Sequence, residues 1–188
     1  MPIVLNGSGT VTGISVGGLP DGIIQSADLA TGVGGKILQV KQTSKSDFTS
    51  LSGSDPTSYA DISGMSVSIT PTSSSNKILV SFIACVSCDT TNRNASIRLM
   101  RDSTNICIGT AGTSRNAALI DRTRSDQAID NYTQQFLDSP NTTSAITYKL
   151  QWATESSGGS ASVYYLNRKG ASANDGAISS ITVMEVAA

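Results

Sequence analysis

The chain has 188 residues, of which 14% are charged and 5% aromatic, and it contains no His. With 13 Lys and Arg against 14 Asp and Glu, its net charge of −1 provides no basic field that would attract nucleic acid or anionic lipid, so we expect neither as a main partner. The lack of His also removes the usual proton-transfer residue of catalytic triads and a common metal ligand.

The first segment, residues 1–35, differs from the rest of the chain. It has no Lys or Arg, and Gly recurs between short apolar groups. Such a segment loses more backbone entropy on ordering than its few apolar side chains offset. We therefore predict an extended Gly-rich N-terminal stem, ordered by copies of itself or by another protein. Its short apolar groups could add strands to a neighbour's sheet edge, and the predicted attachment residues are Ile3, Val4, Leu5, Ile14 and Val16.

In residues 36–188, short β-patterned runs alternate with turns rich in Gly, Ser, Asn and Pro. The residues between the runs show no helical period, so the pattern predicts one all-β body, an antiparallel jelly-roll sandwich. Two of the runs are expected to pair across Ser63-Gly64. The predicted strands are 36–41, 59–62, 65–69, 77–87, 95–100, 105–108, 132–137, 145–153, 163–167 and 178–186, with a weaker signal at 117–120.

Two of these strands are apolar on both faces. They are residues 77–87 (KILVSFIACVS) and the last strand, near the chain end. A sandwich strand needs only one apolar face for its own core, so the second face indicates packing against identical copies. The stem favours a homotrimer with strands parallel to one axis. The predicted trimer interface comprises Leu79, Ile83, Ile181, Met184 and Val186.

The three cysteines do not suggest a disulfide framework or a metal site. Cys85 and Cys88 have metal-ligand spacing, but no second pair and no His accompany them, and Cys107 stands apart. We expect buried thiols, no metal and no cofactor. The start of the chain has no signal-peptide pattern, and no run is long enough for a membrane span, so neither Sec-type export nor membrane insertion is expected.

The stem sequence GSGTVTGISVGGLPDGIIQSADLATGVGG resembles the linkers of bacteriophage tail fibres. The runs SSSNKILVSF, FLDSPNTTSAITYKLQW, SVYYLNR and SSITVMEV resemble the distal knobs of such fibres, most closely those of phages of cyanobacteria and other marine bacteria. These knobs are similar to the trimeric jelly roll of complement and tumour-necrosis-factor-like domains. The resemblance implies a non-enzymatic virion protein, assembled in the host cytoplasm and exposed on the particle, whose stem binds another virion protein. Because no large anchoring domain precedes the stem, a head fibre or capsid decoration protein also fits.

The long polar loops 109–130 and 168–176 are candidates for host-surface binding, since recognition residues often lie in loops on a rigid scaffold. A host glycan is the expected ligand, with weak contacts multiplied over three copies. Of Tyr164 and Tyr165, on opposite faces of one strand, one should be exposed, whereas Trp152 fits the core. The predicted contact residues are Arg115, Arg122, Arg124 and Tyr164.

A glycan-cleaving depolymerase is the alternative from another class. Its acid and base would be paired carboxylates. The candidates are Asp121, Asp126, Asp130 and Glu155, which are more simply explained as solvated loop charges. The chain also lacks a Gly-rich phosphate loop of the GxxxxGK[ST] type. We therefore expect no catalytic residue.

Overall fold

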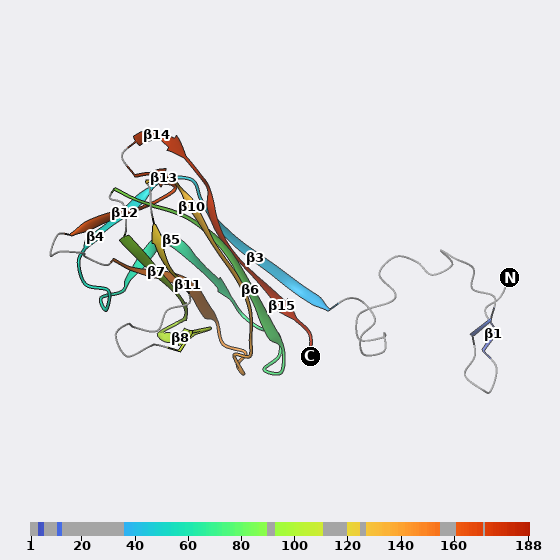
Figure 1. Ribbon diagram of the computed structural model, residues 1–188. Helices are drawn as coiled ribbons and strands as arrows, with labels where there is room; N and C mark the ends of the chain where they lie inside the picture. Colours follow the sequence, from blue (N-terminus) through green and yellow to red (C-terminus); the bar gives the residue numbers. More distant parts are fainter. Residues whose placement is uncertain are drawn as a thin grey trace. The chain divides into compact units, whose positions relative to one another are not determined.

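The computed structural model describes residues 4–5, 11–12, 36–89, 93–110, 120–124, 127–154, 161–170 and 172–188. The chain divides into two units, Met1–Lys36 and Ile37–Ala188. In the first unit, β1 (Val4–Leu5) pairs antiparallel with β2 (Val11–Thr12). The second unit, called the body below, contains all the other strands and is shown in Figure 1.

The body consists of two antiparallel sheets and a small hairpin. The hairpin joins β13 (Arg168–Lys169) to β14 (Ser172–Gly176). The first sheet contains β3 (Ile37–Lys45), β4 (Thr49–Gly53), β6 (Lys77–Cys88), β10 (Asp130–Asp138), β12 (Ser162–Leu166) and β15 (Ser179–Val186). The second contains β5 (Ala60–Ile69), β7 (Arg93–Arg101), β8 (Thr104–Ile106), β9 (Ile120–Arg124) and β11 (Ile146–Thr154).

The strand order is that of a jelly roll. Three positions in the sheets are each filled by two pieces of the chain, namely β3 with β4, β8 with β9, and β12 with β15, and the β13–β14 hairpin lies between the last two in the sequence. Counted this way and numbered in chain order, strand 1 pairs with strand 8, strand 2 with 7, strand 3 with 6 and strand 4 with 5. A long antiparallel hairpin folded over on itself gives this pairing. The predicted all-β antiparallel jelly-roll sandwich is confirmed.

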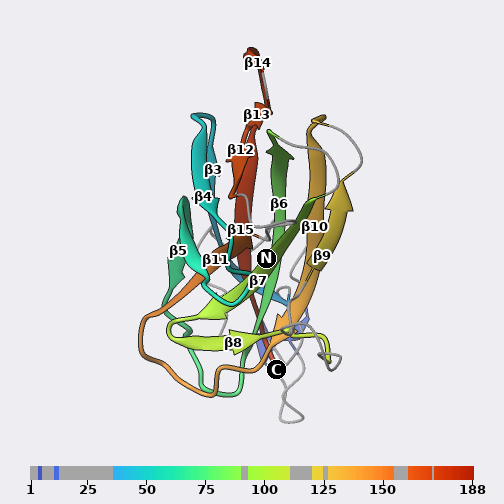
Figure 2. The same cartoon turned by 60° about the vertical axis from the view of Figure 1, so that its left-hand side comes forward.

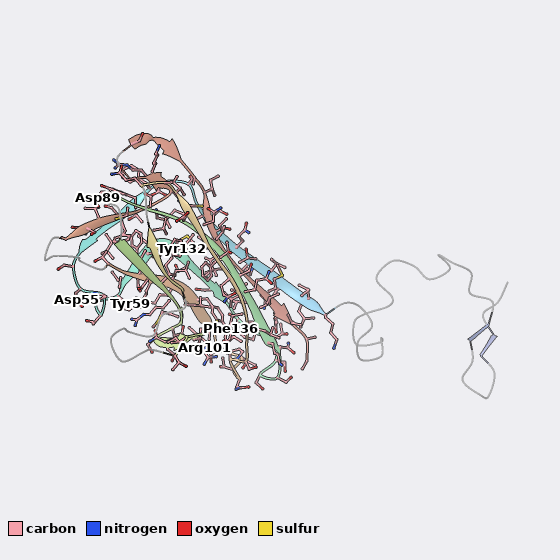
Figure 3. All side chains as sticks on the ribbon, viewed as in Figure 1. Asp55, Tyr59, Asp89, Arg101, Tyr132 and Phe136 are labelled. Carbon is pink, nitrogen blue, oxygen red and sulfur yellow. The ribbon has the colours of Figure 1, made fainter. Side chains whose placement is uncertain are left out.

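The core lies between the two sheets because the strands alternate as a sandwich requires. In β6, Ile78, Val80 and Phe82 point inward and are buried, and Trp152 of β11 is 3% exposed, as expected for a core residue. Figure 3 shows side chains filling the body, with the buried Tyr132 labelled. The predicted pair 59–62 and 65–69 is wrong. These residues form the single strand β5, in which Gly64 takes a positive φ of 80° at a bulge opposite β11.

Asn167 holds the junction where β12 gives way to the β13–β14 hairpin. It is 2% exposed and adopts a left-handed φ of 62°, which Asn tolerates better than most residues. Its Nδ2 donates to the backbone carbonyls of Lys45 (2.7 Å) and Asp47 (3.1 Å), and its Oδ1 accepts from Ser179 Oγ (2.6 Å). One side chain thus joins the β3–β4 corner to the start of β15.

Glu185 closes the opposite end of the first sheet. Its residue is fully buried, and its carboxylate accepts hydrogen bonds from Gln39 Nε2 (2.6 Å), Thr72 N (2.7 Å), Thr72 Oγ1 (2.8 Å) and Asn76 Nδ2 (2.7 Å). Burial alone raises the pKa of this carboxyl, but the donated hydrogen bonds outweigh burial and lower it from 4.5 to about 2. The charged form therefore stabilises the folded body.

We expect Glu185→Gln to remove a defined part of the acid sensitivity. Because the folded pKa lies below the unfolded value, the stabilisation is complete above about pH 4.5 and is lost as pH falls towards 2. The lowered pKa of Glu185 corresponds to about 3 kcal/mol in the free energy of unfolding. Urea unfolding between neutral pH and pH 2 should show the free energy of unfolding of the wild type falling more steeply than that of the variant. Parallel pH profiles would contradict this role for Glu185.

Candidate functional site

The outer face of the first sheet carries an apolar row that crosses four adjacent strands. Figure 2 shows these strands, β3, β15, β6 and β10, side by side. Their register places one outward residue of each at the same level, so that Met184 pairs with both Val40 and Leu79, and Leu79 pairs with Leu137. Val40 is 53% and Leu137 47% exposed, and the two central residues are half-buried. The term apolar row is used below for Val40, Met184, Leu79 and Leu137.

Two polar rows follow on the same face. They contain hydroxyl and amide side chains and one isoleucine, Ile83, and Gln42 Nε2 donates to Thr182 Oγ1 at 2.8 Å. These rows line an open depression of about 580 Å³. The first polar row consists of Gln42, Thr182, Ser81 and Gln135, and the second of Ser44, Ser180, Ile83 and Thr133. None of the three rows contains Lys, Arg, Asp or Glu, so we call this surface the uncharged face.

The outer face of the second sheet has the opposite character. There Lys149 Nζ lies 2.8 Å from Asp61 Oδ2, Gln151 Nε2 donates to Asp61 Oδ1 at 2.5 Å, and Arg98 Nε donates to Gln151 Oε1 at 2.7 Å. The Arg98 guanidinium also covers the Tyr59 ring at 4.0 Å from its centroid. Hydrogen bonds from Lys149 and then from Gln151 lower the pKa of Asp61, so its charged form is favoured. Such a network suits a face in contact with water.

The contrast between the two faces indicates which one is made for contact. An uncharged surface that includes an apolar row gains free energy when it is covered, and it has no charge to desolvate. The outer face of the second sheet, with its Lys149–Asp61 ion pair and the hydrogen bonds around it, would have to give up its hydration. Interface cores are likewise depleted in charged residues. The uncharged face is therefore the candidate interaction site.

The structure divides the predicted trimer-interface residues into two groups. Leu79, Ile83, Met184 and Val186 point outward on the uncharged face or at its end, where Val186 pairs with Ile37 and Lys77. The prediction for Ile181 is wrong, because this side chain is fully buried in the core of its own sandwich and cannot contact a second copy. Val40 and Leu137 of the apolar row were not predicted.

The predicted host-binding residues fare differently. The predicted host contact of Tyr164 is wrong, since this side chain is 1% exposed and belongs to the core. Its neighbour Tyr165 is half-buried and carries the Arg168 guanidinium 4.5 Å above its ring. Arg115 lies outside the described residues, and Arg122 and Arg124 belong to β9, whose side chains are also outside them. Host binding at these arginines stays a prediction.

The attachment residues and the carboxylates remain largely outside the described part. Val4 and Leu5 form β1, whereas Ile3, Ile14 and Val16 are not described. Among the carboxylates, Asp126, Glu155 and the Asp121 side chain are not described, and Asp130 lies half-buried at the start of β10.

The cysteines follow the expectation of buried thiols in two cases. Cys85 and Cys88 are buried thiols, and Cys107 is a partly exposed thiol. Burial raises the pKa of the Cys85 and Cys107 thiols, which favours the unreactive protonated form. Within the described ranges, no group of three His, Cys, Asp or Glu side chains could hold a metal ion. The same residues include no helix able to span a membrane.

Comparisons with known proteins give a likeness of fold only. No model of a known protein family matches the chain, and no curated protein sequence matches it. Among solved structures, one of the infectious bursal disease virus Gx strain is similar with a TM-score of 0.44 and 15% identity, covering 78% of this chain and 40% of that chain. The VP2 subviral particle of the same virus gives a TM-score of 0.36 and 16% identity, covering 80% and 38%. The chain thus spans about two fifths of the length of these proteins, and TM-scores below 0.5 support no conclusion about function.

Proposed function

We propose that this chain is a non-enzymatic structural protein of a phage virion, a homotrimeric fibre subunit whose jelly-roll body assembles through the uncharged face. The observation that carries the proposal is the contrast between the apolar row on one sheet and the ion-paired network on the other. The resemblance of the stem and body sequences to phage fibres supports the virion location. In this proposal the stem binds another virion protein and the body faces the host surface.

The orientation of the strands supports a cyclic assembly. β3 begins where β15 ends, since Ile37 pairs with Val186, so the body starts and finishes at one end. The β13–β14 hairpin projects at the opposite end, as Figure 1 shows. When copies pack by the uncharged face around an axis parallel to the strands, cyclic symmetry brings the first residues of all the bodies to the same end of the assembly. The other end is then free to face outward in every copy.

Sedimentation equilibrium of the full chain tests this proposal. We expect the mass of three chains of 19.4 kDa. Since the uncharged face has no ion pairs to screen, the assembly should persist from about 0.05 to 1 M salt. Added protein should also block adsorption of the phage to its host, whereas a capsid decoration protein would have no effect on adsorption. A monomer at every concentration would contradict the proposed assembly.

A further inference from the structure

The end of the body that carries the β13–β14 hairpin also carries a cluster of two aromatic rings and one guanidinium. Phe48, between β3 and β4, is 57% exposed. The Cζ of Arg168 lies 5.4 Å from the centroid of the Phe48 ring and 4.5 Å from that of Tyr165. We call these three residues the aromatic–arginine cluster.

The cluster is built on a fixed base. The backbone carbonyl of Arg168 accepts a hydrogen bond from Ser87 Oγ, a fully buried side chain of β6, and Arg168 Nε donates to the Ser172 carbonyl at 3.4 Å. The preceding residue, Asn167, is locked by the hydrogen bonds described above. A guanidinium held between two rings loses little conformational entropy when it binds a ligand.

The charge around the cluster favours an acidic ligand. Lys169 follows Arg168 and is exposed. The neighbouring carboxylate, Asp47, is already engaged by Lys45 Nζ at 2.7 Å. That hydrogen bond is the main cause of the lowered pKa of Asp47, so the pair leaves no net negative charge beside Phe48. Arg168 therefore places a positive charge beside the exposed Phe48 ring.

We propose that the aromatic–arginine cluster binds an acidic saccharide, an inference that rests on the proposed outward presentation of this end of the body. The exposed Phe48 ring offers a flat apolar surface to the CH face of a pyranose, and Arg168 offers planar N–H donors to its carboxylate. A nucleic acid is a poorer fit, because it would need a field of several cations and the chain has a net charge of −1.

Titration of the full chain with acidic and neutral oligosaccharides tests the proposal. The probes are short oligomers of galacturonic, glucuronic and mannuronic acid, each paired with its neutral hexose counterpart, followed by NMR and calorimetry up to about 10 mM, the range of weak single-site affinities. We expect at least one acidic oligomer to bind at least fivefold more tightly than its neutral counterpart. Absence of binding across the panel, or equal binding of acidic and neutral oligomers, would overturn the proposal.

Matched variants locate the site. Phe48→Ala and Arg168→Gln should each weaken binding at least tenfold, whereas Phe48→Tyr should retain it. Ile108→Ala changes another exposed apolar residue, 39% exposed, and should bind as the wild type does. Unchanged affinity in Phe48→Ala would overturn the assignment, with thermal unfolding confirming that the variant is folded.

The same samples separate this inference from the proposed assembly. Sedimentation of each variant reports the oligomeric state independently of sugar binding. If the trimer forms but no acidic oligomer binds, the saccharide site is wrong and the assembly stands. If a monomer binds the acidic oligomer through Phe48, the assembly is wrong and the saccharide site stands.

Discussion

Replacing Leu79 with aspartate is expected to convert the assembled protein into monomers that keep the jelly-roll fold. Leu79 lies in the middle of the apolar row, between Met184 and Leu137, and its side chain points away from the core. In the monomer the new carboxylate is hydrated and costs little. In the assembly it would be buried against another uncharged face with no cation to pair with. We expect at least a 100-fold weaker association, about 3 kcal/mol per contact, measured by sedimentation.

Ser66→Asp is the control for this substitution. It places the same charge on the outer face of the second sheet, where Ser66 is exposed and pairs with Lys149. This variant should assemble like the wild type. Circular dichroism and thermal unfolding of Leu79→Asp should show a folded monomer. Normal assembly of Leu79→Asp, or equal loss of assembly in both variants, would show that the uncharged face is not the interface.

The sequence predicted the jelly-roll class because its signals are local. The apolar run along 77–87, the alternation along 145–153 and the turn residues between the runs are visible without any partner strand. Side chains alternate between the two faces of a strand, so Ile181 and Met184 point to opposite faces of the last strand. The structure shows that Ile181 belongs to the core. What the sequence did not reveal is which of the two faces points inward.

The complete apolar row was not predictable for a related reason. Val40 and Leu137 each stand in a mostly polar stretch, and neither looks like an interface residue alone. They join Leu79 and Met184 only through the strand register of β3, β15, β6 and β10. Register depends on pairing between residues far apart in the chain. The aromatic–arginine cluster was missed in the same way, since Phe48 and Arg168 meet only in the folded body.

The burial of polar groups at the ends of the strands could not be predicted from the sequence either. Glu185 reads as a solvated charge near the chain end, yet it is fully buried and accepts four hydrogen bonds. Asp138 reads as a turn residue before Ser139-Pro140, yet it is 6% exposed. From residue type alone, each of these carboxylates is expected at the surface, because buried Asp and Glu are rare unless they are paired. Only the folded chain supplies the partners.

Asp138→Ala is expected to destabilise the body by about 4 kcal/mol. The Asp138 carboxylate, on β10 of the first sheet, accepts two hydrogen bonds from Arg101 Nη1 at 2.8 and 2.9 Å and one from Tyr148 Oη at 2.7 Å. Both donors belong to the second sheet, so one carboxylate links the two layers. Burial raises the pKa of Tyr148, and the Asp138 charge raises it further, so the phenol remains a proton donor. Urea unfolding measures the loss.

A double-mutant cycle identifies the source of this loss. Tyr148→Phe alone removes one hydrogen bond and should cost about 1 kcal/mol. In the Asp138→Ala background the Tyr148 hydroxyl is fully buried and has lost its acceptor, so removing it should cost nothing or restore stability. Asp138→Asn keeps an acceptor oxygen but loses the charge that pairs with Arg101, and its cost should lie between those of the other two single variants. If Asp138→Ala stays within about 1 kcal/mol of the wild type, or if the effects of Asp138→Ala and Tyr148→Phe simply add, the carboxylate does not link the two sheets in this way.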